Sequence, residues 1–169
     1  MFLDSGQSNF SALFQGDIVS NAALLGAIDA GSAVSIPSSA AWAVGGKLEF
    51  GFAAILSHSC EISVETGIKV TSCILAPLRD VSSATPVEKL QLLIESNDVK
   101  GDQPTFLKYF YLPPHTQIGH VKGSVVDFSK LYSVRKGYLD LLRTKKILQV
   151  TPECRAQLAK KLALYFFRE

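Results

Sequence analysis

The chain has 169 residues, of which 47% are hydrophobic and 19% are charged, and its formal net charge is +2. A chain of this length can bury a core without a disulfide or a metal, so we expect one domain spanning residues 1–169. The isoelectric point of about 8.4 is lower than that of a dedicated DNA-binding domain. The apolar excess indicates either a well-filled core or an apolar face that meets a partner.

Cysteine content and hydropathy predict a cytoplasmic protein. Residues 1–14 have neither the basic start nor the long apolar run of a signal peptide. No stretch approaches the 18 or so consecutive apolar residues of a membrane span, so we expect no membrane association. The cysteines are odd in number and widely spaced, which suits a reducing compartment better than a secreted disulfide framework. They are Cys60, Cys73 and Cys154.

The N-terminal third predicts an irregular start followed by a strand. Residues 1–15 are polar and lack a periodic pattern, so we expect an irregular lead-in. Residues 16–19, Gly-Asp-Ile-Val, are typical of a turn that enters a strand. Residues 22–28 could be helix or strand, because a short apolar run does not decide between them. Residues 30–46 are rich in Gly, Ser and Ala and predict a long loop.

A β-hairpin is predicted next. Residues 47–62 and 68–75 are rich in apolar and β-branched side chains, and turn residues 65–67 lie between them. Pro77 is expected to end the second strand because proline cannot donate a hydrogen bond to a neighbouring strand.

Four elements are predicted between the hairpin and the last helix. Thr85 can cap a helix, Pro86 suits its first position and Glu88 completes a capping box. Aromatic and β-branched residues then predict two strands, followed by a short helix. These three elements cover residues 105–112, 123–134 and 137–147.

The C-terminal helix, residues 151–168, has the strongest signals. Thr151 caps it and Pro152 takes its first position. Lys160 and Lys161 lie off its apolar face. The apolar face of this helix consists of Cys154, Leu158, Leu162, Tyr165 and Phe166.

The elements together predict a β-rich α+β fold.

A polar string, Ser-His-Ser-Cys-Glu at residues 57–61, ends the first hairpin strand. Rigid strands often present side chains to a cleft at their ends, so His58, Cys60 and Glu61 are candidate catalytic residues. A thiolate at Cys60 could act as nucleophile with His58 as base. The alternative is structural, with Cys60 as a small buried hydrophobe and His58 bonded to a loop carbonyl.

A metal site is a further alternative for the same string. His58 and Cys60 would then need a distant ligand such as Cys73, His115 or His120. Structural zinc usually requires four ligands with close cysteine pairs, and no such pairs occur here. We therefore predict no metal and no cofactor.

Several basic and aromatic residues are candidates for ligand binding. Arg79 could hold a phosphate or carboxylate, or could pair with Asp80 or Glu49. Hairpin pairing would place Arg79 at the strand end opposite His58. Aromatic residues 109–111 could stack bases, although such residues are more often core. The basic C-terminal third could attract an acidic partner or be a solvated face. Its candidate binding residues are Lys145, Lys146, Lys160 and Lys161.

Three segments resemble a known family when taken in order. Residues 16–19 (Gly-Asp-Ile-Val), 54–57 (Ala-Ile-Leu-Ser) and 74–78 (Ile-Leu-Ala-Pro-Leu) are similar to the "GDIV … PALVVS … APIT" pattern of PemK/MazF-like toxins. The resemblance covers about residues 16–80 and implies a small SH3-like barrel. Family members are ribosome-independent, metal-free ribonucleases that attack RNA through its 2′-hydroxyl.

The catalytic pair of that family does not carry over. The family has an Arg before the second segment, where this chain has Glu-Phe-Gly-Phe at residues 49–52. It has Thr or Ser after the third segment, where this chain has Arg79. The string at residues 57–61 also resembles a "SHxCE" signature of uncharacterised bacterial proteins. The resemblance thus implies a barrel whose ribonuclease chemistry has been lost or rebuilt.

Three functions follow from these observations. The first is a non-catalytic binding module for RNA, DNA or a protein partner, in a bacterial or phage defence or toxin–antitoxin context. The second is an enzyme, ribonuclease-like or a Cys/His-dependent hydrolase, that uses His58, Cys60 and Glu61. The third is a structural subunit of a larger assembly or a homo-oligomer, which the apolar fraction suggests.

Overall fold

The computed structural model is a β-rich α+β fold. Its described part contains one antiparallel sheet of seven strands and three helices. No helix in this part is both long enough and apolar enough to cross a membrane. The structure describes residues 1–4, 6, 8–9, 12–35, 42–58, 72–99, 106–135 and 138–167.

The sheet has the strand order β4-β5-β3-β2-β1-β7, and β6 also pairs with β3. Every neighbouring pair is antiparallel. The strands are β1 (Ile18–Ser35), β2 (Trp42–Ile55), β3 (Ser72–Asp80), β4 (Tyr109–Leu112), β5 (Ser124–Asp127), β6 (Tyr132–Arg135) and β7 (Lys146–Leu148).

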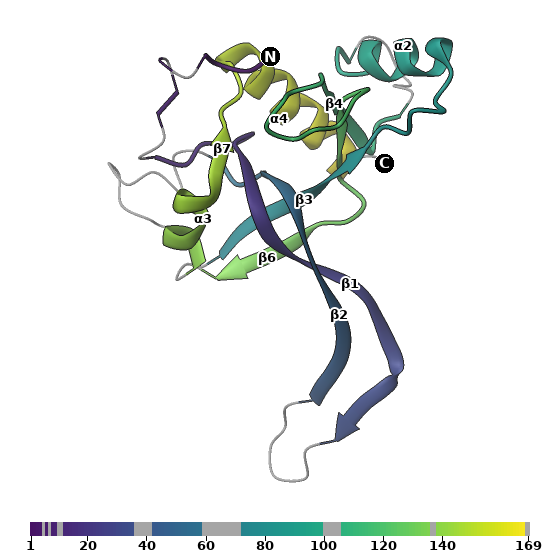
Figure 1. The fold of residues 1–169 in the computed structure, drawn as a ribbon, viewed down its shortest axis with the longest axis vertical. Coiled ribbons are helices and arrows are strands. Elements are labelled where there is room, and N and C mark those ends of the chain that lie inside the picture. The colour runs from purple at the N-terminus through teal and green to yellow at the C-terminus, as the bar shows by residue number, and fades with distance from the viewer. Residues whose placement is uncertain are drawn as a thin grey trace.

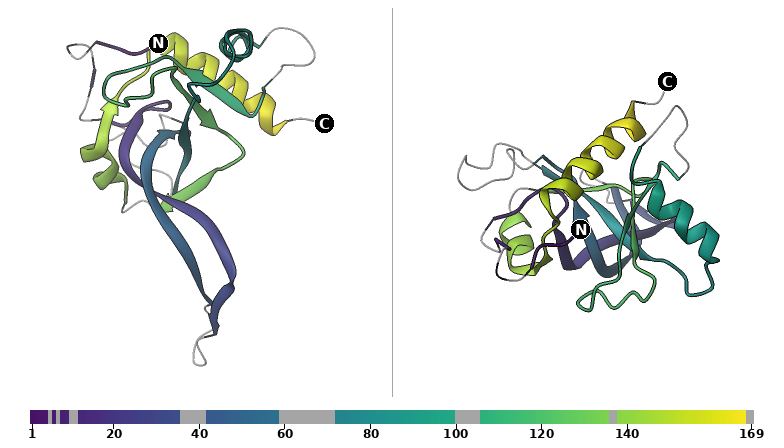
Figure 2. Two further views of the ribbon diagram at one scale, coloured as in Figure 1. Left: turned by 45° about the vertical axis from the view of Figure 1, so that its right-hand side comes forward. Right: turned by 90° about the horizontal axis from the view of Figure 1, so that it is seen from above.

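β1 and β2 form a long two-stranded ribbon that projects from the body of the molecule (Figures 1 and 2). The loop predicted over residues 30–46 is therefore wrong at both of its ends, because β1 continues to Ser35 and β2 starts at Trp42, while residues 36–41 lie outside the described part of the chain. Register shifts interrupt the pairing, and two of them enclose Gly26 and Gly31. Glycine within a strand often marks such an irregularity. The glycine-rich composition that suggested a loop is therefore explained by bulges in the two strands.

β3 is the central strand, and the predicted pairing between the hairpin strands is confirmed, since Ala53 of β2 pairs with Pro77. The expected end at Pro77 is wrong, because β3 continues to Asp80. On its other edge β3 pairs with β6 as far as Leu75 and with β5 from Leu78 onward. Pro77 lies between the two partners, where a missing backbone N–H is tolerated.

The later predicted strands are shorter than expected. Within the strand predicted over residues 105–112, the described part of the structure has only β4. In place of the single strand predicted over residues 123–134, it has the two strands β5 and β6. A turn separates β5 from β6, in which the N–H of Lys130 donates to the carbonyl of Asp127 at 3.2 Å. The continuous run of apolar residues in the sequence gives no sign of this break. After the turn, β6 pairs with β3.

The three helices of the described part are α2 (Val87–Glu95), α3 (Leu139–Lys145) and α4 (Pro152–Phe166). The Thr151 cap of α4 is confirmed, since its hydroxyl accepts from the N–H of Cys154 at 3.3 Å. The predicted cap of α2 is wrong. Pro86 occupies the cap position with extended backbone, and no side chain caps this helix.

Helices α4 and α2 cover opposite faces of the β4-β5-β3 part of the sheet, because successive strand residues point to opposite faces. Phe110 belongs to the same core cluster as Leu158 of α4. Tyr111 and Val125 form a second cluster with Leu93 of α2. The face covered by α2 carries the cavity described below.

Candidate functional site

The predicted catalytic string is only partly placed. His58 follows β2 and is exposed, whereas Cys60 and Glu61 lie outside the described residues. The geometry of the three-residue cluster is therefore not defined by the structure, and its catalytic role stays a prediction.

His58 and Arg79 lie at opposite ends of β3. The N–H of Leu56, two residues before His58, donates to the carbonyl of Ile74 at 2.9 Å. Arg79 follows Ile74 by five residues, which is roughly 17 Å along an extended strand. The structure thus does not bring these two candidate residues together.

The described cysteines and histidines do not gather into a metal site. No cluster of three or more His, Cys, Asp or Glu side chains occurs among the described residues. Burial raises the pKa of the Cys73 and Cys154 thiols to about 11, so both remain protonated at neutral pH. His120 Nδ1 shares a hydrogen bond with Ser124 Oγ at 2.7 Å, and the His115 ring packs edge-on against Phe2.

Lys146, predicted to bind a ligand, is in the interior. Its Nζ lies 2.7 Å from Asp17 Oδ2 and both side chains are completely buried. The ammonium group also donates to the carbonyl of Ala12 at 3.0 Å. Burial raises the pKa of Asp17 to about 6, against the opposing attraction of Lys146. Burial likewise lowers the pKa of Lys146. This pair joins the residue before β1 to the first residue of β7.

Lys161 is also buried, although helical periodicity placed it off the apolar face of α4. Its Nζ donates to Ser96 Oγ at 2.9 Å, just after the end of α2. Burial lowers the pKa of Lys161 to about 8. Neither Lys146 nor Lys161 presents its charge to solvent, so the basic C-terminal third is less exposed than the sequence suggests.

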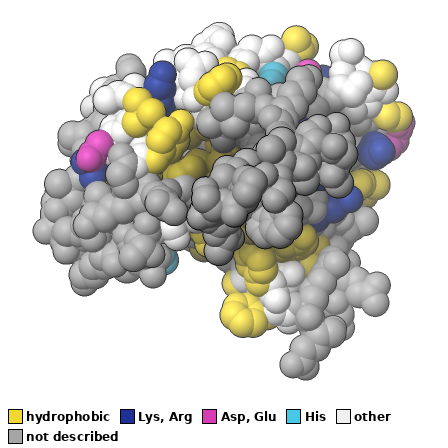
Figure 3. All heavy atoms as spheres, turned by 90° about the horizontal axis from the view of Figure 1, so that it is seen from below, with side chains coloured by type: hydrophobic (Ala, Val, Ile, Leu, Met, Phe, Trp, Pro, Cys, Tyr) yellow, Lys and Arg dark blue, Asp and Glu magenta, His cyan; other side chains and the backbone are white. Residues whose placement is uncertain are grey.

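The other two predicted lysines are at the surface but on different elements. Lys145 ends α3 and is half-buried, whereas Lys160 is exposed on α4. Figure 1 shows α3 and the C-terminal end of α4 on opposite sides of the molecule. The Lys and Arg side chains coloured in Figure 3 are likewise scattered and form no single patch on that face.

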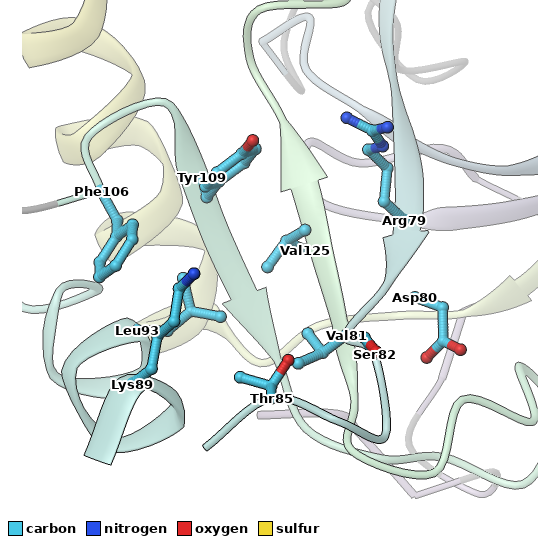
Figure 4. Close-up of a pocket in the computed structure, with 10 residues that line it drawn as sticks. All are labelled: Arg79, Asp80, Val81, Ser82, Thr85, Lys89, Leu93, Phe106, Tyr109 and Val125. Carbon is cyan, nitrogen blue, oxygen red and sulfur yellow. The ribbon is translucent and has the colours of Figure 1, made fainter. Parts of the chain in front are cut away.

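A cavity of about 310 Å³ lies between α2 and the β4-β5-β3 part of the sheet, and we call it the α2 cavity. In Figure 4, Phe106 and Tyr109 stand on one side, Arg79 on the other, and Val125 between them. Lys89 and Leu93 of α2 form a further wall. The remaining lining residues come from the end of β3 and the loop after it, and are Asp80, Val81, Ser82 and Thr85.

Arg79 is held in place by a buried carboxylate. Its Nη1 donates to Asp127 Oδ2 at 3.1 Å, and the Arg79 side chain is 58% exposed while that of Asp127 is 1% exposed. Oδ1 of Asp127 accepts from the N–H and hydroxyl of Ser129. The sequence suggested Asp80 or Glu49 as the partner of Arg79, whereas the structure pairs it with Asp127 of a neighbouring strand. A carboxylate so fixed orients the guanidinium, whose exposed part can bind an anion.

The aromatic wall is formed by a tight turn before β4. The N–H of Tyr109 donates to the carbonyl of Phe106 at 2.9 Å, which brings both half-buried rings to the same wall. The Lys108 ammonium lies 5.0 Å from the centre of the Tyr109 ring. Tyr109 was one of the aromatic residues considered for base stacking, whereas Phe110 is fully buried in the core.

Helix α2 is attached to the sheet by Asn97. The Asn97 side chain donates to the carbonyl of Tyr111 at 2.7 Å and accepts from the Tyr111 N–H at 2.8 Å. An amide thereby occupies the free edge of β4 as a neighbouring strand would. The cavity wall that carries Lys89 is therefore anchored at the C-terminal end of α2.

A second, larger cavity of about 490 Å³ lies between the N-terminal residues, β7 and residues 115–117. Its described lining includes Asp4 and His115 but neither Lys nor Arg. Of these two cavities, the α2 cavity is the one whose described lining combines Lys and Arg with aromatic side chains. Sequence reasoning singled out Arg79 and Tyr109 separately, but no local motif joins them, because they come from β3 and β4. No protein-family model and no curated protein matches the chain.

Proposed function

We propose that the protein is a non-catalytic module that binds single-stranded nucleic acid in the α2 cavity. One observation carries the proposal: a single cavity combines two half-buried aromatic rings with an arginine oriented by a buried carboxylate. Every base has a flat face on which an aromatic ring can stack, so this contact does not depend on the nucleotide sequence. The planar guanidinium is suited to phosphate oxygens because it can donate two parallel hydrogen bonds.

The charges around the α2 cavity support an anionic ligand. Its lining contains two basic side chains, Arg79 and Lys89, and one acidic side chain, Asp80. Asp80 points away from the aromatic wall in Figure 4. Two further lysines lie beside the cavity, since Lys108 is over the Tyr109 ring and Lys122 donates to the carbonyl of Thr85 at 2.8 Å. Binding is expected to weaken as salt concentration rises.

We also propose that the sheet is related to the SH3-like barrel of the PemK/MazF-like toxins. Support comes from β1, β2 and β3, which are consecutive antiparallel neighbours within the stretch that the resemblance covers. The Gly-Asp motif has a structural role here. Gly16 has a φ of +88°, and a Cβ there would lie 2.5 Å from the Val150 side chain. Asp17 forms the buried pair with Lys146. With the family's catalytic pair absent from the sequence, binding without turnover is the function proposed.

Fluorescence anisotropy with end-labelled 12-nucleotide RNA and DNA strands tests the binding function. We expect Tyr109→Ala to weaken binding about 10-fold, since stacking contributes about 1–3 kcal/mol per base. Arg79→Ala should weaken binding of all sequences and reduce the slope of affinity against salt by about one ion. Lys160→Ala, an exposed lysine outside the cavity, is the matched control and should change little. No binding by the wild type, or a loss confined to Lys160→Ala, would overturn the cavity proposal.

The same RNA, run on a gel with and without EDTA, tests the absence of catalysis. Intact RNA is expected. Cleavage that persists in EDTA and disappears in His58→Ala would instead favour the enzyme alternative. A chain that binds no nucleic acid but elutes as a stable oligomer would favour the structural-subunit alternative.

A further inference from the structure

We infer that the α2 cavity holds one unstacked base of a single strand, with Phe106 and Tyr109 against the base and the hydroxyls of Ser82 and Thr85 at its edge. The inference rests on the proposed nucleic-acid binding and names the part of the ligand that enters the cavity. The phosphate next to that base would lie on the side of Arg79.

The size of the cavity suits a single base. Its volume of about 310 Å³ is at the low end of the range for small-ligand sites. Val125 of the sheet forms its floor, α2 forms one wall, and Val81, Ser82 and Thr85 lie at one end. A base in a duplex is paired and stacked on both sides, so it cannot enter such a site without being extruded.

The aromatic wall is held in a strained conformation. Phe106 has a φ of +54°, in the left-handed region that non-glycine residues rarely adopt. Such a conformation costs about 1–2 kcal/mol. Strained residues of this kind concentrate at ligand sites, where the surrounding structure maintains them. Here the Phe106 ring with this backbone conformation lies at the cavity, one turn from Tyr109.

The floor of the cavity is rigid. Val81, Leu93, Tyr111 and Val125 form a buried cluster directly beneath it. The N–H of Val81 donates to the carbonyl of Gly123 at 3.1 Å, which ties the end of β3 to β5. A preformed site loses little conformational entropy when a base enters, and this favours binding.

The charge arrangement favours a strand over a phosphorylated peptide. Phosphopeptide sites usually present a cluster of arginines to one phosphate. In the α2 cavity only Arg79 is an arginine, and one of its N–H groups already donates to Asp127. Lys89 lies on α2 and Arg79 on β3, so the two cations are suited to separate phosphates along a chain.

The hydroxyls of Ser82 and Thr85 would contribute to the choice of base. Ser82 and Thr85 lie in the connection between β3 and α2, where Ser82 Oγ accepts from the N–H of Ala84 at 3.2 Å. A hydroxyl can both donate and accept, and can therefore contact the polar edge of a base. Thr85→Val removes this capacity with little change in shape.

The test uses a set of 12-nucleotide strands, each with one abasic position, measured by competition against the labelled intact strand. We expect one position at which base removal weakens binding about 10-fold, and under threefold losses elsewhere. We also expect the same duplex to bind more weakly than the strand. Thr85→Val should narrow the affinity differences among the four bases at the sensitive position, whereas Ser83→Ala, exposed in the same loop, should not.

The outcomes separate this inference from the proposed function. Tight binding of the intact strand with equal losses at all abasic positions, or with none, overturns the inserted base but leaves nucleic-acid binding in place. Equal affinity for the duplex does the same. Absence of binding by the intact strand overturns both, and so does displacement of the strand by a phosphotyrosine peptide that binds more tightly.

Discussion

Lys161 of α4 donates a hydrogen bond from Nζ to Ser96 Oγ at 2.9 Å in the protein interior. Ser96 Oγ in turn donates to the carbonyl of Leu93 at 2.7 Å. This short chain of hydrogen bonds joins α4 to the last turn of α2, whose residues Lys89 and Leu93 line the α2 cavity. Lys161 therefore links α4 to the helix that forms one wall of the α2 cavity, without lining the cavity itself.

Replacement of Lys161 tests the cost of its buried charge. Burial lowers its pKa from 10.5 to about 8, a difference equivalent to roughly 3 kcal/mol. Because the unfolded chain binds more protons between pH 8 and about 10.5, wild-type stability should rise with pH in that window. Lys161→Met should be more stable at pH 7 and lack this rise, as measured by urea unfolding at pH 7, 9 and 10. Parallel pH profiles of variant and wild type would contradict the prediction.

The buried pair of Asp17 and Lys146 predicts that substitutions at these two residues have strongly non-additive effects on the free energy of unfolding. Lys146→Met should destabilise the fold by about 3–5 kcal/mol, because a carboxylate is left buried without its cation. The loss should be smaller at pH 5 than at pH 8, since burial already raises the pKa of Asp17 to about 6 and removal of Lys146 raises it further. The double variant Asp17→Leu with Lys146→Met should recover most of the stability. A double variant as unstable as the sum of its parts would exclude this coupling.

Asn97 is predicted to anchor α2 to β4. Asn97→Ala removes both hydrogen bonds to Tyr111 and should destabilise the protein by about 2 kcal/mol. Hydrogen exchange at the Tyr111 amide should accelerate strongly. Gln91→Ala is the control, because Gln91 makes an exposed hydrogen bond to Glu95 on α2 and should cost less than 0.5 kcal/mol or so. Unchanged protection of the Tyr111 amide in Asn97→Ala would count against the anchor.

Two glycines with similar φ values allow the cost of backbone strain to be measured separately from the cost of steric crowding. Gly123 has a φ of +87° and Gly119 a φ of +78°. A Cβ at Gly123 would lie 2.4 Å from the carbonyl oxygen of Leu112, whereas one at Gly119 would meet nothing within 4 Å. Gly119→Ala should cost about 1 kcal/mol from strain alone. Gly123→Ala should cost clearly more and loosen the β4–β5 pairing, as thermal unfolding of both variants can show. Equal costs would mean that the crowding at Gly123 is relieved by a small shift.

Elements with strong local signals were predicted well. Thr151 and Pro152 specify the start of α4 through hydrogen bonding and fixed backbone geometry, both of which act within one turn. The β-rich class and the pairing of β2 with β3 also follow from sequence, because two runs of apolar and β-branched residues on either side of a turn favour a hairpin. Predictions failed where a partner strand decides the outcome. Pro77 remains in β3 because β5 and β6 meet there, and residues 30–35 and 42–46 join a ribbon because β1 and β2 pair with each other.

The sequence by itself determined the β-rich α+β class, the C-terminal helix and the residue types available for a site. Only the tertiary structure decided which of those residues meet. It turned Lys146 and Lys161 inward, because the energy of a buried charge depends on acceptors from distant segments such as Asp17 and Ser96. It brought Arg79 and Tyr109 to opposite sides of one cavity through the pairing of β3 and β4 with β5, and such pairing depends on packing over the whole sheet and not on local spacing.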